Sequence, residues 1–192
     1  QMRIDFVSDV SCPWCIIGLG GLEEALRRME GVDADIRFHP FELNPAMPPE
    51  GENVAEHIAR KYGASPEQSA ASRDAIRERA AEIGFAMNTG PDSRIWNTFD
   101  AHRLLHWAGT LGGDAQGRLK HALFAAHFGE GRNIADHGVL VGVADRAGLD
   151  GLEVATILAS DRYASDVRAA EEFWRRQGVQ AVPTLVIDGR YL

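Results

Sequence analysis

The alternation of apolar and polar side chains predicts β-strands near the beginning of the chain. Residues 2–7 alternate in polarity, and residues 33–41 form a second such segment that ends where Pro40 and further prolines open a loop. Between these segments, residues 16–28 carry apolar side chains at helical spacing. A strand, a helix and a strand in this order predict two parallel strands joined by a right-handed crossover.

Helical periodicity dominates the long middle of the chain. The clearest case places Ile95, Phe99, His102, Leu105 and His106 on one side of a single predicted helix. Glycines end or bound most of the other helical segments. We expect helices over residues 54–62, from the Ser65-Pro66-Glu67 start onward, and over 95–108, 118–128, 136–147, 151–159 and 162–176.

Strand signals return at the end of the chain. Residues 182–187 are rich in β-branched side chains, and Asp188-Gly189 is a strong signal for a tight hairpin. Residues 190–192 then begin the partner strand. Because a helix should follow and cover the sheet, we expect this chain to be a trimmed form of a longer one.

Strands at both ends and helices between them predict an α/β fold with one interrupted sheet domain. We assign residues 1–51 and 161–192 to the sheet domain, and residues 52–160 to a large all-helical insertion. Neither a repeat nor a low-complexity linker divides the chain further.

Composition and charge narrow the classes of function. The 192 residues are 45% hydrophobic and 25% charged, which is typical of a globular protein. A formal net charge of -8 argues against nucleic-acid and anionic-membrane partners, because both require clustered positive charge. No apolar run approaches the roughly 18 residues of a membrane span. No signal peptide precedes the first strand, so we expect a cytoplasmic protein.

The motif Cys12-Pro13-Trp14-Cys15 carries the chemistry that the sequence predicts. It lies between the first predicted strand and the helix that follows. The N-terminus of a helix has unpaired N–H groups and about half a positive elementary charge, which favours a thiolate over a thiol. Two thiols in this position are therefore placed for thiol–disulfide exchange. In the cytoplasm a catalytic disulfide is also more usual than a structural one.

The sequence does not favour a metal site or a nucleotide site. A zinc site would require further ligands, and the chain has no second C-x-x-C motif. His102 and His106 have i,i+4 spacing, but Arg103 stands where a zinc-protease motif has glutamate, so we expect a packed helix face. The glycines after Cys15 do not match a dinucleotide motif, because Glu23 occupies the last glycine position. We therefore expect neither a metal nor a cofactor.

The motifs and their order resemble the thioredoxin superfamily. The features are a strand, a C-P-W-C motif that begins a helix, and a distant Val-Pro-Thr that enters a terminal hairpin. The helical insertion narrows the resemblance to DsbA-like proteins, and finer landmarks are similar to the FrnE-like branch. These landmarks are residues 8–15, Pro40-Phe41-Glu42-Leu43-Asn44-Pro45, Asn97-Thr98 with residues 101–104, and the segment from Gly178 to Gly189. Gly20-Gly21 within the first helix and the early end at Leu192 depart from the family pattern.

The two cysteines are expected to have different roles. Cys12 lies at the helix end and should be the more exposed, so we expect it to be the attacking thiolate with the lower pKa. Cys15, one turn inside, would resolve the mixed disulfide and release the substrate.

Four residues are expected to contact the substrate. The resemblance implies a cis Val182–Pro183 bond beside the cysteines, whose preceding backbone groups can pair with a substrate chain. A trans proline would otherwise be the default, since only about 5–6% of such bonds are cis. Pro13 and Trp14 lie between the cysteines, where Trp14 could tune the redox potential or offer an aromatic surface.

Structural roles are the simplest hypotheses for Asp9 and for three aromatic residues. Asp9 could cap local amides before the helix or help to move the proton of Cys15, although its charge would oppose a thiolate at Cys12. We slightly favour capping. Trp107, Phe124 and Phe128 are expected to pack in the core of the insertion, while an apolar groove beside Cys12 could hold unfolded chains.

These features predict a dithiol–disulfide oxidoreductase that acts on protein or peptide substrates and requires a redox recycling partner. Two alternatives stay open at this point. One is a glutathione-dependent isomerase or transferase of the same superfamily, and the other is a chaperone-like module that binds unfolded chains. The sequence does not determine whether the pair oxidises, reduces or isomerises, because related motifs span about -270 to -120 mV.

Overall fold

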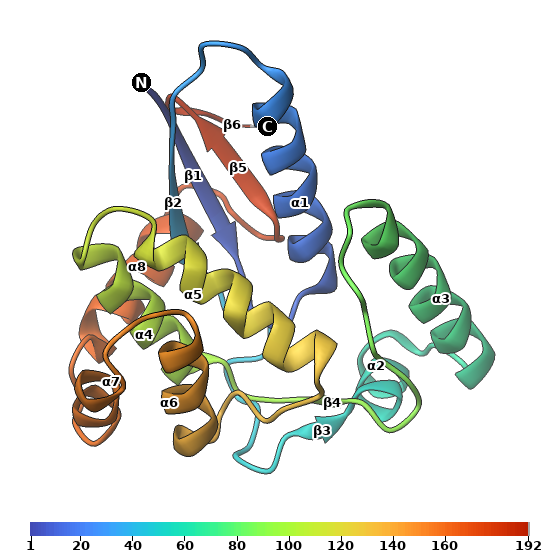
Figure 1. Cartoon of the computed structure of the whole chain (residues 1–192). Coiled ribbons are helices and arrows are strands. Elements are labelled where there is room, and N and C mark those ends of the chain that lie inside the picture. Colours follow the sequence, from blue (N-terminus) through green and yellow to red (C-terminus); the bar gives the residue numbers. More distant parts are fainter. Residues whose placement is uncertain (192) are drawn as a thin grey trace.

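A four-stranded sheet with strand order β2-β1-β5-β6 forms the centre of the computed structural model, which describes residues 1–191 (Figure 1). β1 pairs with β2 in parallel and with β5 in antiparallel orientation, and β6 pairs antiparallel with β5. The strands are β1 (Met2–Ser8), β2 (Ala34–Pro40), β5 (Thr184–Ile187) and β6 (Arg190–Tyr191). The two ends of the chain therefore form one sheet, as predicted, and Leu192 of the expected partner strand lies outside the described residues.

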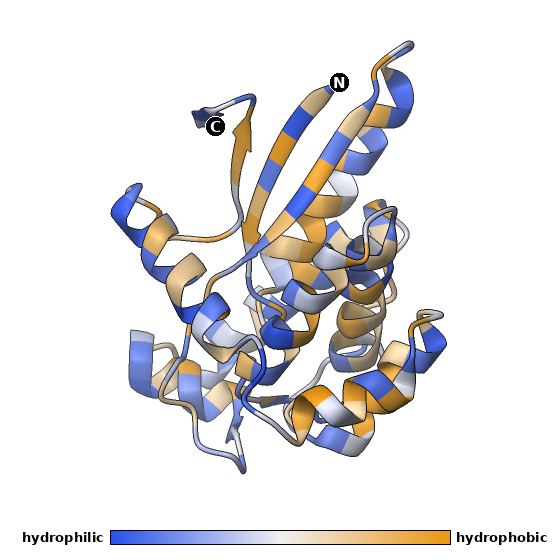
Figure 2. Cartoon of the chain, turned by 90° about the vertical axis from the view of Figure 1, so that its left-hand side faces the viewer, coloured by the Kyte–Doolittle hydropathy of each residue, from blue (hydrophilic) through white to orange (hydrophobic). Residues whose placement is uncertain are grey.

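The alternation along β1 assigns its side chains to two faces. Phe6 contributes to an apolar cluster with Ile16 and Leu19 of α1 (Pro13–Arg28). The next residue, Val7, packs on the opposite face with Trp174 of α8 (Ala164–Arg176). Figure 2 shows the resulting alternation of hydrophobic and hydrophilic residues along the strands. Successive side chains of a strand point to opposite faces, and these two pack on different helices. α1 and α8 therefore cover opposite faces of the sheet.

The segment between β2 and α8 contains mostly helices, joined by loops and one short pair of strands. Its elements are β3 (Glu52–Asn53), α2 (Val54–Tyr62), α3 (Pro66–Glu82), β4 (Arg94–Ile95), α4 (Phe99–Thr110), α5 (Ala115–Phe124), a π-helical turn (Ala125–Gly129), α6 (His137–Arg146) and α7 (Gly151–Leu158). Leu104, Leu119, Leu140 and Ile157 are fully buried in a core that α4, α5, α6 and α7 share. This confirms a helical insertion, and its boundaries at residues 52 and 160 stay a prediction.

Capping explains why α3 begins where the sequence predicts. The Ser65 hydroxyl accepts a hydrogen bond from the amide of Gln68, and the Gln68 side chain accepts one from the amide of Ser65. Pro66 occupies the first helical position, where its missing N–H costs no hydrogen bond.

The predicted start of a helix at residue 95 is wrong. Ile95 lies in β4 and pairs with Glu52 of β3, so its backbone is extended. The helix α4 begins at Phe99, whose amide donates to the side-chain oxygen of Asn97. Ile95 matches the helical spacing of the following apolar residues, but its hydrogen bonds are made to a distant segment, which periodicity alone does not reveal.

No helix among residues 1–191 is both long and apolar enough to cross a membrane. The cytoplasmic location stays a prediction.

Candidate functional site

The two cysteines lie at the start of α1, the helix that follows β1 along the chain (Figure 1). Cys12 has extended backbone angles (φ -97°, ψ 112°), and Pro13 is the first helical residue. Within residues 1–191 no side chain forms a capping hydrogen bond at this helix N-terminus, so its positive end faces the thiols. Both thiols are free, with Cys12 4% exposed and Cys15 0% exposed, while Trp14 between them is 44% exposed.

The environment shifts the pKa values of the two thiols in opposite directions. A hydrogen bond from Cys15 lowers the pKa of Cys12, against the effects of burial and of the Asp9 charge. Burial raises the pKa of Cys15 well above its usual value, and the neighbouring Cys12 raises it further. Cys12 is thus the thiol that ionises first and the more exposed of the two, in the direction that the sequence predicts.

The peptide bond between Val182 and Pro183 is cis, as predicted, and it lies against the motif. The carbonyl oxygen of Val182 is 3.9 Å from the Cys12 sulfur. β5 begins immediately afterwards at Thr184, so the sheet fixes this loop beside the dithiol.

Gly18 allows α1 to approach Pro183. A Cβ atom at Gly18 would lie 2.9 Å from Cγ of the Pro183 ring, which is closer than two carbon atoms pack. Gly21, three residues further along α1, has open space around it instead. Glycine at position 18 is therefore required by the contact between the helix and the loop.

We expect Gly18→Ala to leave the protein less stable than Gly21→Ala by about 1–3 kcal/mol. Both changes gain the same helix propensity, of up to about 1 kcal/mol, so their difference isolates the overpacking against Pro183. Urea unfolding of the two variants measures this difference. Equal stabilities would contradict the close approach of α1 to Pro183.

Asp9 and His102 form a buried pair behind the dithiol. The Asp9 carboxylate accepts a hydrogen bond from Nε2 of His102 at 3.0 Å through one oxygen. Its other oxygen accepts from the amide of Leu43 at 2.9 Å and from the hydroxyl of Ser11 at 3.1 Å. Burial alone would raise the pKa of Asp9, but the hydrogen bond and charge of His102 and the Leu43 amide bring it below its usual value.

This pair corrects the interpretation of Asp9 and adds a polar contact to the predicted packing of His102. Asp9 does not cap α1, because the amide that it binds belongs to Leu43 in the loop after β2. His102 is buried on the inner face of α4, as predicted, but it also donates to a charged partner from the other end of the fold. His106 has the expected packing role and contacts the ring of Tyr163. Residues 93 positions apart make the Asp9–His102 bond, so no local pattern could indicate it.

Two buried basic side chains near the dithiol were not predicted from the sequence. Lys120 on α5 is 0% exposed, and its Nζ has no hydrogen-bond partner within residues 1–191. Burial lowers its pKa, against the charges of Cys15, Asp9 and Cys12. His127 in the π-helical turn is also buried, which lowers its pKa to about 4. Lys120, Phe124 and His127 follow helical spacing along one inner face, which is the signal that could have found them.

The aromatic residues of the insertion are divided between two cores. Trp107 packs in the core of the helical insertion, as expected. Phe124 and Phe128 instead pack in the cluster that contains Cys12 and Cys15. The expectation for Phe124 and Phe128 is therefore wrong, because α5 and its π-helical extension reach the dithiol.

A family model described as a DSBA-like thioredoxin domain matches residues 3–192. The chain belongs to the DsbA-like thioredoxin domain family. A solved structure described as a probable DsbA oxidoreductase from Streptomyces coelicolor is 36% identical to this DsbA-like chain, with a TM-score of 0.91. The match covers 98% of this chain and 81% of the Streptomyces chain. The FrnE-like branch is not named by these comparisons and stays a prediction.

More distant relatives extend the comparison. The uncharacterized protein YwbO of Bacillus subtilis is 27% identical over 187 residues, which cover 97% of this DsbA-like chain and 86% of YwbO. A cytosolic disulfide reductase from Pseudomonas aeruginosa, solved with GSH, shares the fold at 17% identity and a TM-score of 0.61, covering 99% of this chain and 88% of the reductase. A 2-hydroxychromene-2-carboxylate isomerase shares it at 15% identity and a TM-score of 0.69, covering 99% and 87%.

A second buried charged cluster joins the loop after β2 to α8 in this DsbA-like fold. Arg168 donates hydrogen bonds to the carboxylates of both Glu42 and Glu171. The guanidinium also lies over the ring of Phe99, 3.9 Å from its centroid. Burial and the neighbouring carboxylate of Glu171 raise the pKa of Glu42 to about 8. One cation therefore serves two buried carboxylates, and Glu42 keeps its proton near neutral pH.

The stability of the protein is expected to fall as the pH rises through about 8, and Glu42→Gln should reduce this fall. The folded state holds a proton on Glu42 up to about pH 8, whereas a free glutamate loses it near 4.5. The contribution of this proton is thus fully present below pH 4.5 and lost through pH 8, with a slope of at most about 1.4 kcal/mol per pH unit. Urea unfolding of both proteins between pH 5 and about pH 9 checks this. Parallel stability profiles would contradict it.

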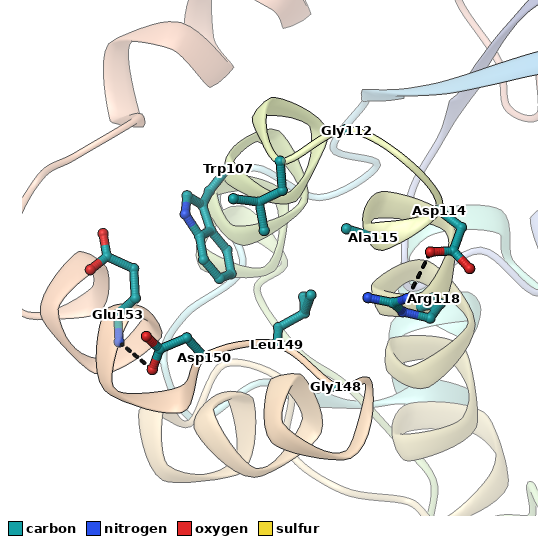
Figure 3. Close-up of a pocket in the computed structure, with 10 residues that line it drawn as sticks. Trp107, Gly112, Asp114, Ala115, Arg118, Gly148, Leu149, Asp150 and Glu153 are labelled. Carbon is teal, nitrogen blue, oxygen red and sulfur yellow. Dashed lines mark hydrogen bonds and ion pairs between the residues drawn. The ribbon is translucent and has the colours of Figure 1, made fainter.

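A cavity of about 520 Å³ lies within the helical insertion, between α4, α5 and α7 (Figure 3). Its charged groups are already engaged, since Arg118 is bonded to Asp114 at 2.7 Å and Glu153 to Arg162 at 2.9 Å. Among residues 1–191, no group of three His, Cys, Asp or Glu side chains is placed to hold a metal ion.

Proposed function

We propose that this protein is a dithiol–disulfide oxidoreductase that exchanges disulfides with protein or peptide substrates through Cys12 and Cys15. The observation that carries the proposal is the opposite shift of the two thiol pKa values at one helix N-terminus. One thiol is prepared to attack, and the other is held protonated until the first has reacted.

The reaction follows from the positions of the two sulfur atoms. The Cys12 thiolate attacks one sulfur of a substrate disulfide, and the other substrate sulfur leaves with the electron pair as a thiolate. Cys15 then loses its proton and attacks the Cys12 sulfur of the mixed disulfide. The Cys12–Cys15 bond forms, the second substrate sulfur leaves as a thiolate, and each departing thiolate takes up one proton. The substrate gains two electrons and the enzyme loses two, and the reverse sequence oxidises a substrate dithiol.

The surroundings of Cys12 favour a polypeptide substrate. The backbone of Val182, 3.9 Å from the Cys12 sulfur, offers hydrogen-bonding groups to an extended chain that crosses the site. Trp14 offers an exposed aromatic surface next to the attacking sulfur. We assign Pro13, Trp14, Val182 and Pro183 to substrate contact, and Cys12 and Cys15 to catalysis. A recycling partner must restore the starting redox state after each turnover.

The alternative enzymatic function is glutathione-dependent isomerisation, since a 2-hydroxychromene-2-carboxylate isomerase shares this fold. Here Cys12 and Cys15 together hold both electrons, so a bound glutathione thiolate would be drawn into a mixed disulfide that Cys15 cleaves. The dithiol therefore favours exchange without glutathione as an obligatory cosubstrate. A chaperone-like role would not use the Cys12–Cys15 pair.

We expect the protein to reduce a fluorogenic peptide disulfide, and insulin, with dithiothreitol as the only reductant. Both required electrons pass through the Cys12–Cys15 pair, so added glutathione should not be required for turnover. Stopped-flow or plate fluorescence measures the rate with and without glutathione. Isomerisation of an aromatic substrate that depends on glutathione, without disulfide turnover, would contradict the proposal.

A further inference from the structure

The resolving step presents an electrostatic problem that the cysteines alone do not solve. Cys15 is 0% exposed, so the thiolate that must attack the mixed disulfide forms without contact with water. Its burial and its neighbour Cys12 both oppose this charge. A resolving thiolate in this position requires a positive charge that is also buried.

Lys120 brings such a group to the site from the helical insertion. Its Nζ lies 5.1 Å from the ring centroid of Phe124 and 5.9 Å from that of Phe38. Both rings belong to the same apolar cluster as Cys12 and Cys15. The charges that act on Lys120 are those of Cys15, Asp9 and Cys12, in decreasing order.

The nearby carboxylate does not account for the burial of Lys120. Both oxygens of Asp9 already accept hydrogen bonds, one from His102 and the other from Leu43 and Ser11. His127 cannot replace the lysine as a cation, because burial keeps its ring neutral above about pH 4. Nζ of Lys120 itself has no hydrogen-bond partner among the described residues. A buried amine without a hydrogen-bond partner lowers the stability of the folded state. The burial of Lys120 is therefore not explained by a contribution to stability.

We propose that Lys120, delivered by α5, supplies the positive charge that balances the Cys15 thiolate while the mixed disulfide is resolved. The inference rests on the proposed function and adds a residue to it. Lys120 acts through Cys15 and forms no bond to substrate, so it is a positioning residue. In this step the Cys15 proton is transferred to the departing substrate thiolate, the Cys12–Cys15 bond forms, and the bond between Cys12 and substrate breaks. The ammonium group is unchanged at the end.

The assignment predicts that removal of the Lys120 charge slows the attack by Cys15 more than the attack by Cys12. An aromatic disulfide reagent that releases a coloured thiolate separates these steps, because attack by Cys12 releases the first equivalent and attack by Cys15 the second. Lys120→Met should slow the second phase about tenfold, corresponding to a change of about one unit in the pKa of Cys15. The pH dependence of that phase should move to higher pH, while the first phase changes less.

Stability separates this role from a structural one. Replacement of an unpartnered buried amine by an apolar side chain of similar length should leave the unfolding midpoint unchanged or raise it. Lys61→Met is the matched control, since Lys61 is the only other lysine in the chain and is exposed. Lys120→Gln provides a second neutral variant should the Met side chain disturb packing.

The experiment records both phases by stopped flow for the wild type, Lys120→Met, Lys120→Gln and Lys61→Met, with Cys15→Ser as a reference that gives the first phase alone. The expected result is a slower second phase in both Lys120 variants at undiminished stability, with Lys61→Met like the wild type. An unaffected second phase, or unfolding of both Lys120 variants, would overturn the inference and leave the proposed function standing. Absence of the first phase in the wild type would overturn the proposed function itself.

Discussion

Disulfide turnover is expected to fall to the uncatalysed rate when Cys12 is replaced by serine. The reaction passes through a covalent bond between the Cys12 sulfur and a substrate sulfur, and a hydroxyl oxygen cannot form that bond. The fold should survive, because serine is close to cysteine in volume and the 3.9 Å contact between the Cys12 sulfur and the Val182 carbonyl is a weak one. The measurement is dithiothreitol-driven reduction of insulin and of a peptide disulfide.

The second cysteine should behave differently. In Cys15→Ser the Cys12 thiolate can still attack, but nothing within the protein can break the resulting mixed disulfide. We expect the variant to accumulate as a covalent adduct whose mass equals that of the protein plus one substrate thiol. Intact-mass measurement before and after reduction detects this adduct.

Trp14→Ala is a suitable control for both cysteine variants. It changes an exposed side chain in the same motif but leaves both sulfur atoms in place, so it should slow turnover only by weakening the contact with substrate. Full activity in Cys12→Ser, or an adduct that forms on Cys15 instead of Cys12, would overturn the assignment of roles.

The parts of this structure that local patterns encode could be predicted from the sequence. The alternation of residues 2–7 defines β1, and the spacing of apolar side chains predicts nearly all of the helices. Asp188-Gly189 forms the predicted turn, in which both residues have positive φ values of 48° and 81°. The cysteine motif and the cis bond before Pro183 could be predicted through the resemblance to a family, whose order of landmarks spans nearly the whole chain.

The parts that depend on distant contacts could not be predicted. Ile95 fits a helical pattern, yet its backbone pairs with Glu52. Two of the partners of Asp9 are Leu43 and His102, which are 34 and 93 positions away. The helical spacing of Lys120 with Phe124 could place its side chain on an inner face, but only the packing of α5 brings that face to the dithiol cluster. The roles of the charged side chains near the site thus depend on tertiary contacts. The role of the thiols, in contrast, is indicated by a local four-residue motif.

Replacement of Asp9 by alanine is expected to destabilise the protein by about 2–4 kcal/mol. The change leaves His102 Nε2 and the amide of Leu43 without their acceptor, and each donor left unpaired in a buried site costs about 1–3 kcal/mol. Asp9→Asn should cost less, because its side-chain oxygen can still accept one of these hydrogen bonds. Urea unfolding at neutral pH gives both values.

The pH dependence of this effect has a defined sign. The folded state holds the pKa of Asp9 below the 3.8 of a free aspartate, so the stabilisation is present above that pH and is lost as the pH falls through the lower, folded-state value. The wild type and Asp9→Ala should therefore differ most near neutral pH and converge in acid. A difference that grows as the pH falls would contradict the buried carboxylate.

The same variant should make Cys12 more reactive although it weakens the fold. The charge of Asp9 raises the pKa of Cys12, so its removal should lower that pKa and increase the thiolate fraction at mildly acidic pH. Alkylation of Cys12 by iodoacetamide across a pH series, with Cys15→Ser as the common background, measures the shift. Asp9→Asn removes the charge at a smaller cost in stability, so it should show the same shift and thereby exclude local unfolding as the cause. A Cys12 pKa that rises in both variants would show that Asp9 promotes the thiolate, with its hydrogen bonds outweighing its charge.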